Sequence, residues 1–197
     1  MRANLRAVFA ALAVVFIFSG CATEKRSFEY SVDVKHIEPA YNSMMERYDV
    51  VKEMAENKWD TFSEDEQKKL NLVANYVRLI DARVLRIRNK HADGMEGTRV
   101  TVPELGYIYT LARDAYNISY GIATNHMAEL SVTDVLTLQN FNVQLLELDE
   151  EIKALTVTPH YNDVDHILYN MLNISSAALK IIIPVVLGRE IYAGPEQ

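Results

Sequence analysis

Apolar residues recur along this chain at alternating spacings of three and four positions, which is the period of helices that bury one face. Five segments carry the pattern, at about 37–59, 64–90, 102–122, 131–155 and 162–188. The clearest apolar seam lies in the second segment and consists of Leu70, Val73, Val77, Ile80, Val84 and Ile87. The pattern predicts an all-α fold, an antiparallel up-and-down bundle of about five helices.

Capping residues predict where these helices begin. A serine or threonine followed three positions later by an acidic residue satisfies two backbone amides of a first turn. Such pairs occur at Ser63 and Glu66, at Thr101 and Glu104, and at Ser131 and Asp134. Asn162 is a candidate cap for the last helix. The segments between the helices are short, which favours antiparallel neighbours.

Two prolines bear on the limits of the bundle. Pro39 falls in the first turn of the first helix, where proline is tolerated, whereas Pro184 is expected to bend or end the last helix. We therefore predict the bundle over 35–188 and an irregular tail over 189–197. Residues Ala177 to Leu187 are apolar nearly all round, and we expect them in the core; the alternative is contact with a partner or with lipid.

The first twenty residues follow a different pattern. Arg2 and Arg6 precede an apolar run from Ala7 to Phe18, and two small residues stand before Cys21. A run of about a dozen apolar residues is shorter than the roughly twenty that span a bilayer. A cleaved signal peptide over residues 1–20 is therefore favoured over a retained membrane helix.

The residues Phe18-Ser19-Gly20-Cys21 resemble the lipobox of bacterial lipoproteins, with Phe18 in place of the more usual leucine. The resemblance covers only the first two dozen residues. It implies cleavage before Cys21 and lipidation of that cysteine, for example by palmitate, and makes residues 21–34 a lipidated N-terminus and tether. With Ala22 next, it also implies sorting to the cell outer membrane, facing the periplasm, in a Gram-negative cell. The alternative is an ordinary signal peptide whose cleavage region contains a cysteine.

Composition narrows the classes of partner. The formal net charge is −7, and it becomes about −9 when Arg2 and Arg6 leave with the signal. So acidic a chain is a poor candidate for nucleic acid, whose phosphates require a basic surface. Cys21 is the one cysteine of the sequence, which excludes an intrachain disulfide and a cysteine-based metal cluster.

The sequence has no glycine-rich phosphate loop, nucleophile elbow or paired-histidine zinc motif, so we expect neither an enzyme nor a cofactor. The best cluster of metal-ligand residue types is His160, Asp163, Asp165 and His166. We favour a simpler explanation, in which the aspartates stabilise the N-terminus of the last helix, and we predict no metal. The basic residues Arg83, Arg86, Arg88 and Lys90 are likewise interpreted as cations near a helix C-terminus, and not as a lipid-binding patch.

A candidate ligand or partner surface combines an aromatic stripe with the apolar end of the last helix. It consists of Tyr109, Tyr116, Tyr120, Ile181 and Ile183. For the three tyrosines the commoner explanation is partial burial in the bundle, with the hydroxyls at its rim. We expect an envelope lipoprotein that binds another envelope protein, as a non-catalytic adaptor. The alternative is a lipid-anchored sensor or carrier that holds a small ligand in an apolar, tyrosine-lined cavity. A third hypothesis, a metalloenzyme using His160 and His166, is the least favoured.

Overall fold

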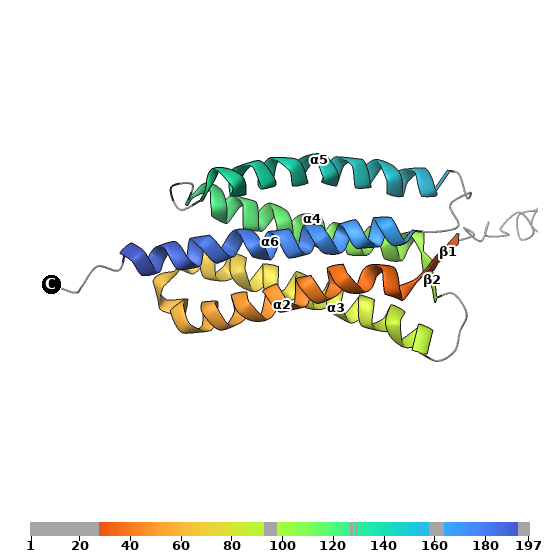
Figure 1. Ribbon diagram of the computed structural model, residues 1–197, viewed down its shortest axis with the longest axis horizontal. Helices are drawn as coiled ribbons and strands as arrows, with labels where there is room; N and C mark the ends of the chain where they lie inside the picture. Colours follow the sequence, from red (N-terminus) through yellow and green to blue (C-terminus); the bar gives the residue numbers. More distant parts are fainter. Residues whose placement is uncertain (1–27, 93–97, 127, 129, 158–163, 193–197) are drawn as a thin grey trace, which may run out of the picture.

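The computed structural model describes residues 28–92, 98–126, 128, 130–157 and 164–192. These residues form a bundle of five long helices with a small two-stranded sheet at one end (Figure 1). The elements in chain order are β1 (Glu29–Val32), α2 (Val34–Lys58), the 3-10 turn η1 (Trp59–Thr61), α3 (Glu64–Ala92), β2 (Thr98–Thr101), α4 (Val102–Thr124), α5 (Val132–Leu155) and α6 (Asp165–Tyr192). The predicted all-α bundle is confirmed.

Consecutive helices run in opposite directions, as Figure 1 shows. Helix α6 lies at the centre and packs mainly against α2 and α4, which run in the same direction as α6. Helix α3 packs on α4, and α5 lies along the outside of α4 and α6. The closest packing therefore joins helices that are not consecutive in the sequence.

The central position of α6 explains why its sequence is apolar nearly all round. By length and composition the segment Asp165–Val185 would be able to cross a membrane, but 67% of its apolar window is buried inside the bundle. Burial on all sides is the property of a core helix. The expectation that this apolar stretch packs in the core is confirmed for Ala177, Ala178, Leu179, Ile181, Ile182 and Val185.

Two of the predicted capping boxes are present. The Ser63 amide donates to Glu66 Oε2 at 3.0 Å, and the Glu66 amide donates to Ser63 Oγ at 3.4 Å. The same reciprocal pair joins Thr101 and Glu104, with distances of 3.0 and 3.3 Å. Both boxes fix the start of a helix where the sequence predicts it, because the bonding groups lie within four residues of each other.

The prediction of an irregular tether over residues 21–34 is wrong for its last six residues. Residues Glu29–Val32 form strand β1, which pairs antiparallel with β2 in the register Glu29 to Thr101. Tyr30 and Val32 are buried, and Asp33 caps α2 by accepting from the Lys35 amide at 2.9 Å. Four residues are too few for alternation to stand out, and the pairing strand is distant in the sequence.

The predicted position of Pro39 is also wrong, and so is an end of the last helix at Pro184; a bend there stays a prediction. Pro39 is the sixth residue of α2 and thus lies beyond its first turn. Pro184 does not end α6, which continues to Tyr192, past the predicted limit at residue 188. A proline inside a helix removes one backbone hydrogen bond. Burial of Ile182 and Val185 on either side of Pro184 holds the helix in place despite that loss.

The hydrophobic core of the described residues runs from Tyr30 to Val185 and draws on both strands and all five helices. Residues 1–21 lie outside the described part of the chain. A chain that begins at Ala22 keeps every residue of this core and is therefore expected to fold by itself.

Candidate functional site

Helix α5 has two apolar faces. One face packs into the bundle and contains the predicted stripe, of which Leu138, Leu145, Leu148, Ile152 and Leu155 are buried. On the opposite face, Val132, Leu136, Val143 and Leu146 are 78%, 55%, 55% and 70% exposed. At about 100° per residue these four side chains fall within one narrow sector of the helix. We call these four residues the α5 outer face.

The α5 outer face is poor in charge as well as apolar. Between Val132 and Leu146 the sequence contains one charged residue, Asp134, and the other polar residues are Thr, Asn and Gln. A solvent-facing helix surface normally carries charged residues. Depletion of charge around exposed apolar side chains is typical of the centre of a protein–protein interface.

Hydrogen bonds from tyrosine hydroxyls connect α5 to the bundle. The Tyr109 hydroxyl donates to the Leu145 carbonyl at 3.0 Å, and the Tyr116 hydroxyl donates to the Leu138 carbonyl. From β1, the Tyr30 hydroxyl donates to the Leu155 carbonyl at 2.9 Å. Burial raises the pKa of each of these three tyrosines, so all three remain neutral donors at neutral pH.

The five residues of the predicted ligand or partner surface have different environments. Tyr109 and Tyr116 are buried and bonded to α5, and Ile181 is buried in α6. Tyr120 is 37% exposed, with its ring centroid 6.3 Å from that of Tyr116, and Ile183 is partly exposed. Binding at these residues stays a prediction. The α5 outer face was not predicted from the sequence, although the spacing of its apolar residues and its low charge are signals that the sequence contains.

The region of the candidate metal cluster contains a bonded aspartate. Asp165 accepts from the Asp33 amide at 2.8 Å and lies 2.7 Å from His36 Nδ1, which joins the starts of α6 and α2. His166 is exposed and lies 3.6 Å from Glu151. Among the described residues, no group of three or more His, Cys, Asp or Glu side chains is placed to hold a metal ion. His160, Asp163 and the predicted lipidation site Cys21 lie outside the described residues.

Two arginines of the basic segment contact aromatic rings. The Arg88 guanidinium lies 4.9 Å from the centroid of the Tyr41 ring and bonds Glu38 at 3.2 Å. The Arg83 guanidinium lies 4.9 Å from the Tyr107 ring. These contacts tie α3 to α2 and to α4, so both side chains take part in packing between helices.

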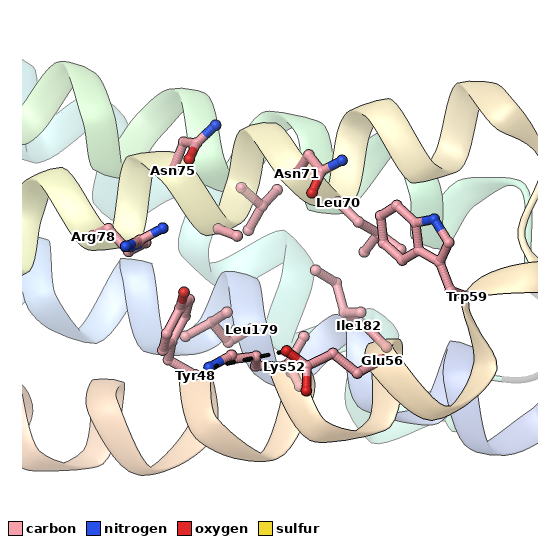
Figure 2. A pocket seen from close by; sticks show the side chains of 14 residues that line it. Tyr48, Lys52, Glu56, Trp59, Leu70, Asn71, Asn75, Arg78, Leu179 and Ile182 are labelled. Atoms are coloured by element: carbon pink, nitrogen blue, oxygen red, sulfur yellow. Dashed lines mark ion pairs between the residues drawn. The ribbon is translucent and has the colours of Figure 1, made fainter.

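A cavity of about 210 Å³ opens between α2 and α3, above α6 (Figure 2). Its apolar walls come from all three helices, and Trp59 of η1 stands at one end. None of the five residues of the predicted ligand or partner surface lines this cavity.

A comparison of the chain with protein families, curated proteins and solved structures found no match.

Proposed function

We propose that this protein is a cell-envelope lipoprotein, anchored through lipid on Cys21, whose helical bundle binds another envelope protein without catalysing a reaction. In a Gram-negative cell the bundle would face the periplasm from the outer membrane. The α5 outer face is the binding surface. The observation that carries the proposal is the outward side of α5 between Val132 and Leu146, which is exposed, apolar and nearly free of charge.

The position of α5 supports this assignment. The helix lies at the periphery of the bundle, and its inward face is already buried against α4 and α6. Its outward leucines and valines follow helical spacing, which is how a helix presents anchors to the apolar groove or helix of a partner. Leu72 and Leu79 of α3 are also exposed and lie on one face of their helix. Unlike the α5 outer face, this pair has several basic residues close by in the sequence, namely Lys68, Lys69, Arg78 and Arg83.

Site-specific crosslinking in living cells tests the binding surface. A photo-crosslinking amino acid at Val143 should yield a discrete product with an envelope protein. Leu146→Lys should abolish that product, because a charge placed within an apolar interface is costly to bury. Leu72→Lys, at a leucine of α3 that is 44% exposed, is the matched control and should leave the product unchanged.

Both lysine variants should keep the stability of the parent chain to within about 0.5 kcal/mol, because both positions are on the surface. If the Val143 product is absent, or if Leu146→Lys leaves it as strong as Leu72→Lys does, then the α5 outer face is not the binding surface.

The anchor has its own test. Inhibition of signal peptidase II should leave the full-length precursor, and Cys21→Ser should abolish labelling with radioactive fatty acid. Labelling that persists in the Cys21→Ser chain would refute the anchor and would leave the role of the α5 outer face to be judged on the crosslinking alone.

A further inference from the structure

The cavity between α2 and α3 lies where both helices of this hairpin have a small side chain. Ala55 of α2 and Ala74 of α3 line it. Both helices pack mainly on other helices, α2 on α6 and α3 on α4, so the space between them is not closed by direct contact. Figure 2 shows Arg78 and Tyr48 at one end of this space and Trp59 at the other.

The inner surface of the cavity is apolar. Leu179 and Ile182 of α6 form its floor, and each is 1% exposed in the folded chain. Val51, Leu70 and Val73 of the two walls are buried as well. These five side chains expose little area, so the apolar surface open to a ligand comes mainly from the partly exposed lining residues Tyr48, Ala55, Trp59 and Ala74. Covering this surface with an apolar group is favourable.

The rim of the cavity is polar and carries two cations, Arg78 and Lys52, and one anion, Glu56. Arg78 makes no ion pair within the described part of the chain, whereas Arg88 on the same helix has both Glu38 and the Tyr41 ring. Lys52 is 3.9 Å from Glu56, and both of these side chains are well exposed. The Arg78 guanidinium therefore offers its paired donors to an incoming anion, and a carboxylate matches their geometry.

We propose that this cavity binds a water-borne amphiphile with a single apolar tail and a carboxylate head. The tail lies over Leu179 and Ile182 and points toward Trp59, and the carboxylate bonds Arg78. An engineered cavity of about 150 Å³ holds benzene, so about 210 Å³ suits a tail of roughly eight carbons. The lining residues come from α2, η1, α3 and α6, so this site is separate from the α5 outer face.

The chain contains one tryptophan, Trp59, and it lines the cavity, so its fluorescence reports occupancy directly. The experiment titrates sodium octanoate, below its micelle concentration, into the chain beginning at Ala22. We expect a saturable change in the Trp59 emission. Octan-1-ol, which has the tail without the charge, should bind about tenfold more weakly, because it lacks the charge-assisted hydrogen bond.

Three variants separate the two parts of the site. Arg78→Gln should weaken octanoate binding about tenfold and leave octan-1-ol binding unchanged. Arg86→Gln, at an exposed arginine of α3 outside the cavity lining, is its matched control and should change neither. Ala74→Leu should fill the space and abolish binding of both ligands, with circular dichroism to check that the bundle is folded.

Three results would overturn the proposal. The first is an emission that does not saturate with octanoate. The second is equal octanoate affinity in the Arg78→Gln and Arg86→Gln chains. The third is unchanged binding in a folded Ala74→Leu chain. Because the α5 outer face takes no part in this titration, each of these results leaves the crosslinking test of the proposed function intact.

Discussion

Three tyrosine hydroxyl groups each donate a hydrogen bond to a backbone carbonyl of α5 and so join this helix to the rest of the molecule. The Tyr116 side chain is fully buried, and its hydroxyl bonds a carbonyl in the middle of α5. The centroid of its ring lies 6.2 Å from the centroid of the Phe141 ring, so the ring keeps this packing contact when the hydroxyl is removed. Replacement by phenylalanine therefore isolates the contribution of one buried hydrogen bond.

Tyr116→Phe should lower the free energy of unfolding by about 1 kcal/mol, the usual net value of such a bond. Tyr120→Phe is the matched control one turn later on α4. Its side chain is 37% exposed, so its loss should stay within about 0.5 kcal/mol. Urea denaturation at neutral pH measures both values. Equal losses in the two variants would mean that the bond to Leu138 contributes nothing.

The same tyrosines should make the fold sensitive to alkali. Burial raises the pKa of Tyr30, Tyr109 and Tyr116 above the ordinary value of 10.0. Above that pH the unfolded chain loses phenolic protons that the folded chain still holds. Their contribution to stability is therefore complete below about pH 10 and is lost as the pH rises toward the folded pKa values.

Urea midpoints measured between about pH 9 and pH 11 should fall with pH, and should fall less steeply in Tyr116→Phe, which has one such group fewer. Because these groups stabilise the fold only while they are protonated, a midpoint that rises with pH over this range would contradict their burial.

At the scale of an element, the stability of α4 can be raised at two glycine positions. Gly106 and Gly121 both lie within the helix, and a Cβ atom added at either position would meet nothing within 4 Å. Glycine in a helix costs backbone entropy that alanine does not. The gain on replacement should therefore come without any steric cost.

Gly106→Ala and Gly121→Ala should each raise the free energy of unfolding by about 0.5–1 kcal/mol. Ala112→Gly, at a buried position of the same helix, should have the opposite sign. Thermal denaturation of the three chains gives the order of their stabilities directly. A loss of stability in both alanine variants would show that the glycines have a role that helix propensity does not describe.

At the scale of the whole molecule, stability is distributed unevenly. Helix α6 is buried on nearly all sides, whereas α5 buries one face and leaves the opposite face exposed. Segments with few buried contacts open at lower free energy than the core does. Amide hydrogen exchange should therefore be faster along α5 than along residues 167–182 of α6. Uniform exchange across the two helices would indicate that the bundle opens only as one unit.

The structural features that could be predicted from the sequence are those that depend on neighbours within a few residues. The seam of α3 and the boxes at Ser63 and Thr101 are local signals, and the structure confirms them. The sequence did not predict that α6 packs with two parallel helices, because an apolar seam does not say which helix covers it. The β1–β2 pair and the cavity were missed for the same reason, since each joins segments that are far apart in the sequence.

Helices α2, α4 and α6 run in the same direction from the end of the bundle at which the chain enters it. With the proposed lipid anchor on Cys21, the two ends of the bundle would therefore lie at different distances from the membrane. Strand β1 lies at one end of the bundle, and η1 lies at the other end of α2 (Figure 1). Under the proposed lipid anchor on Cys21, the β1 end is the one nearer the membrane. The 25 residues of α2 separate these ends by about 37 Å at 1.5 Å per residue. An upright bundle would act as a spacer that presents Trp59 and the cavity to the aqueous compartment, out of reach of the bilayer.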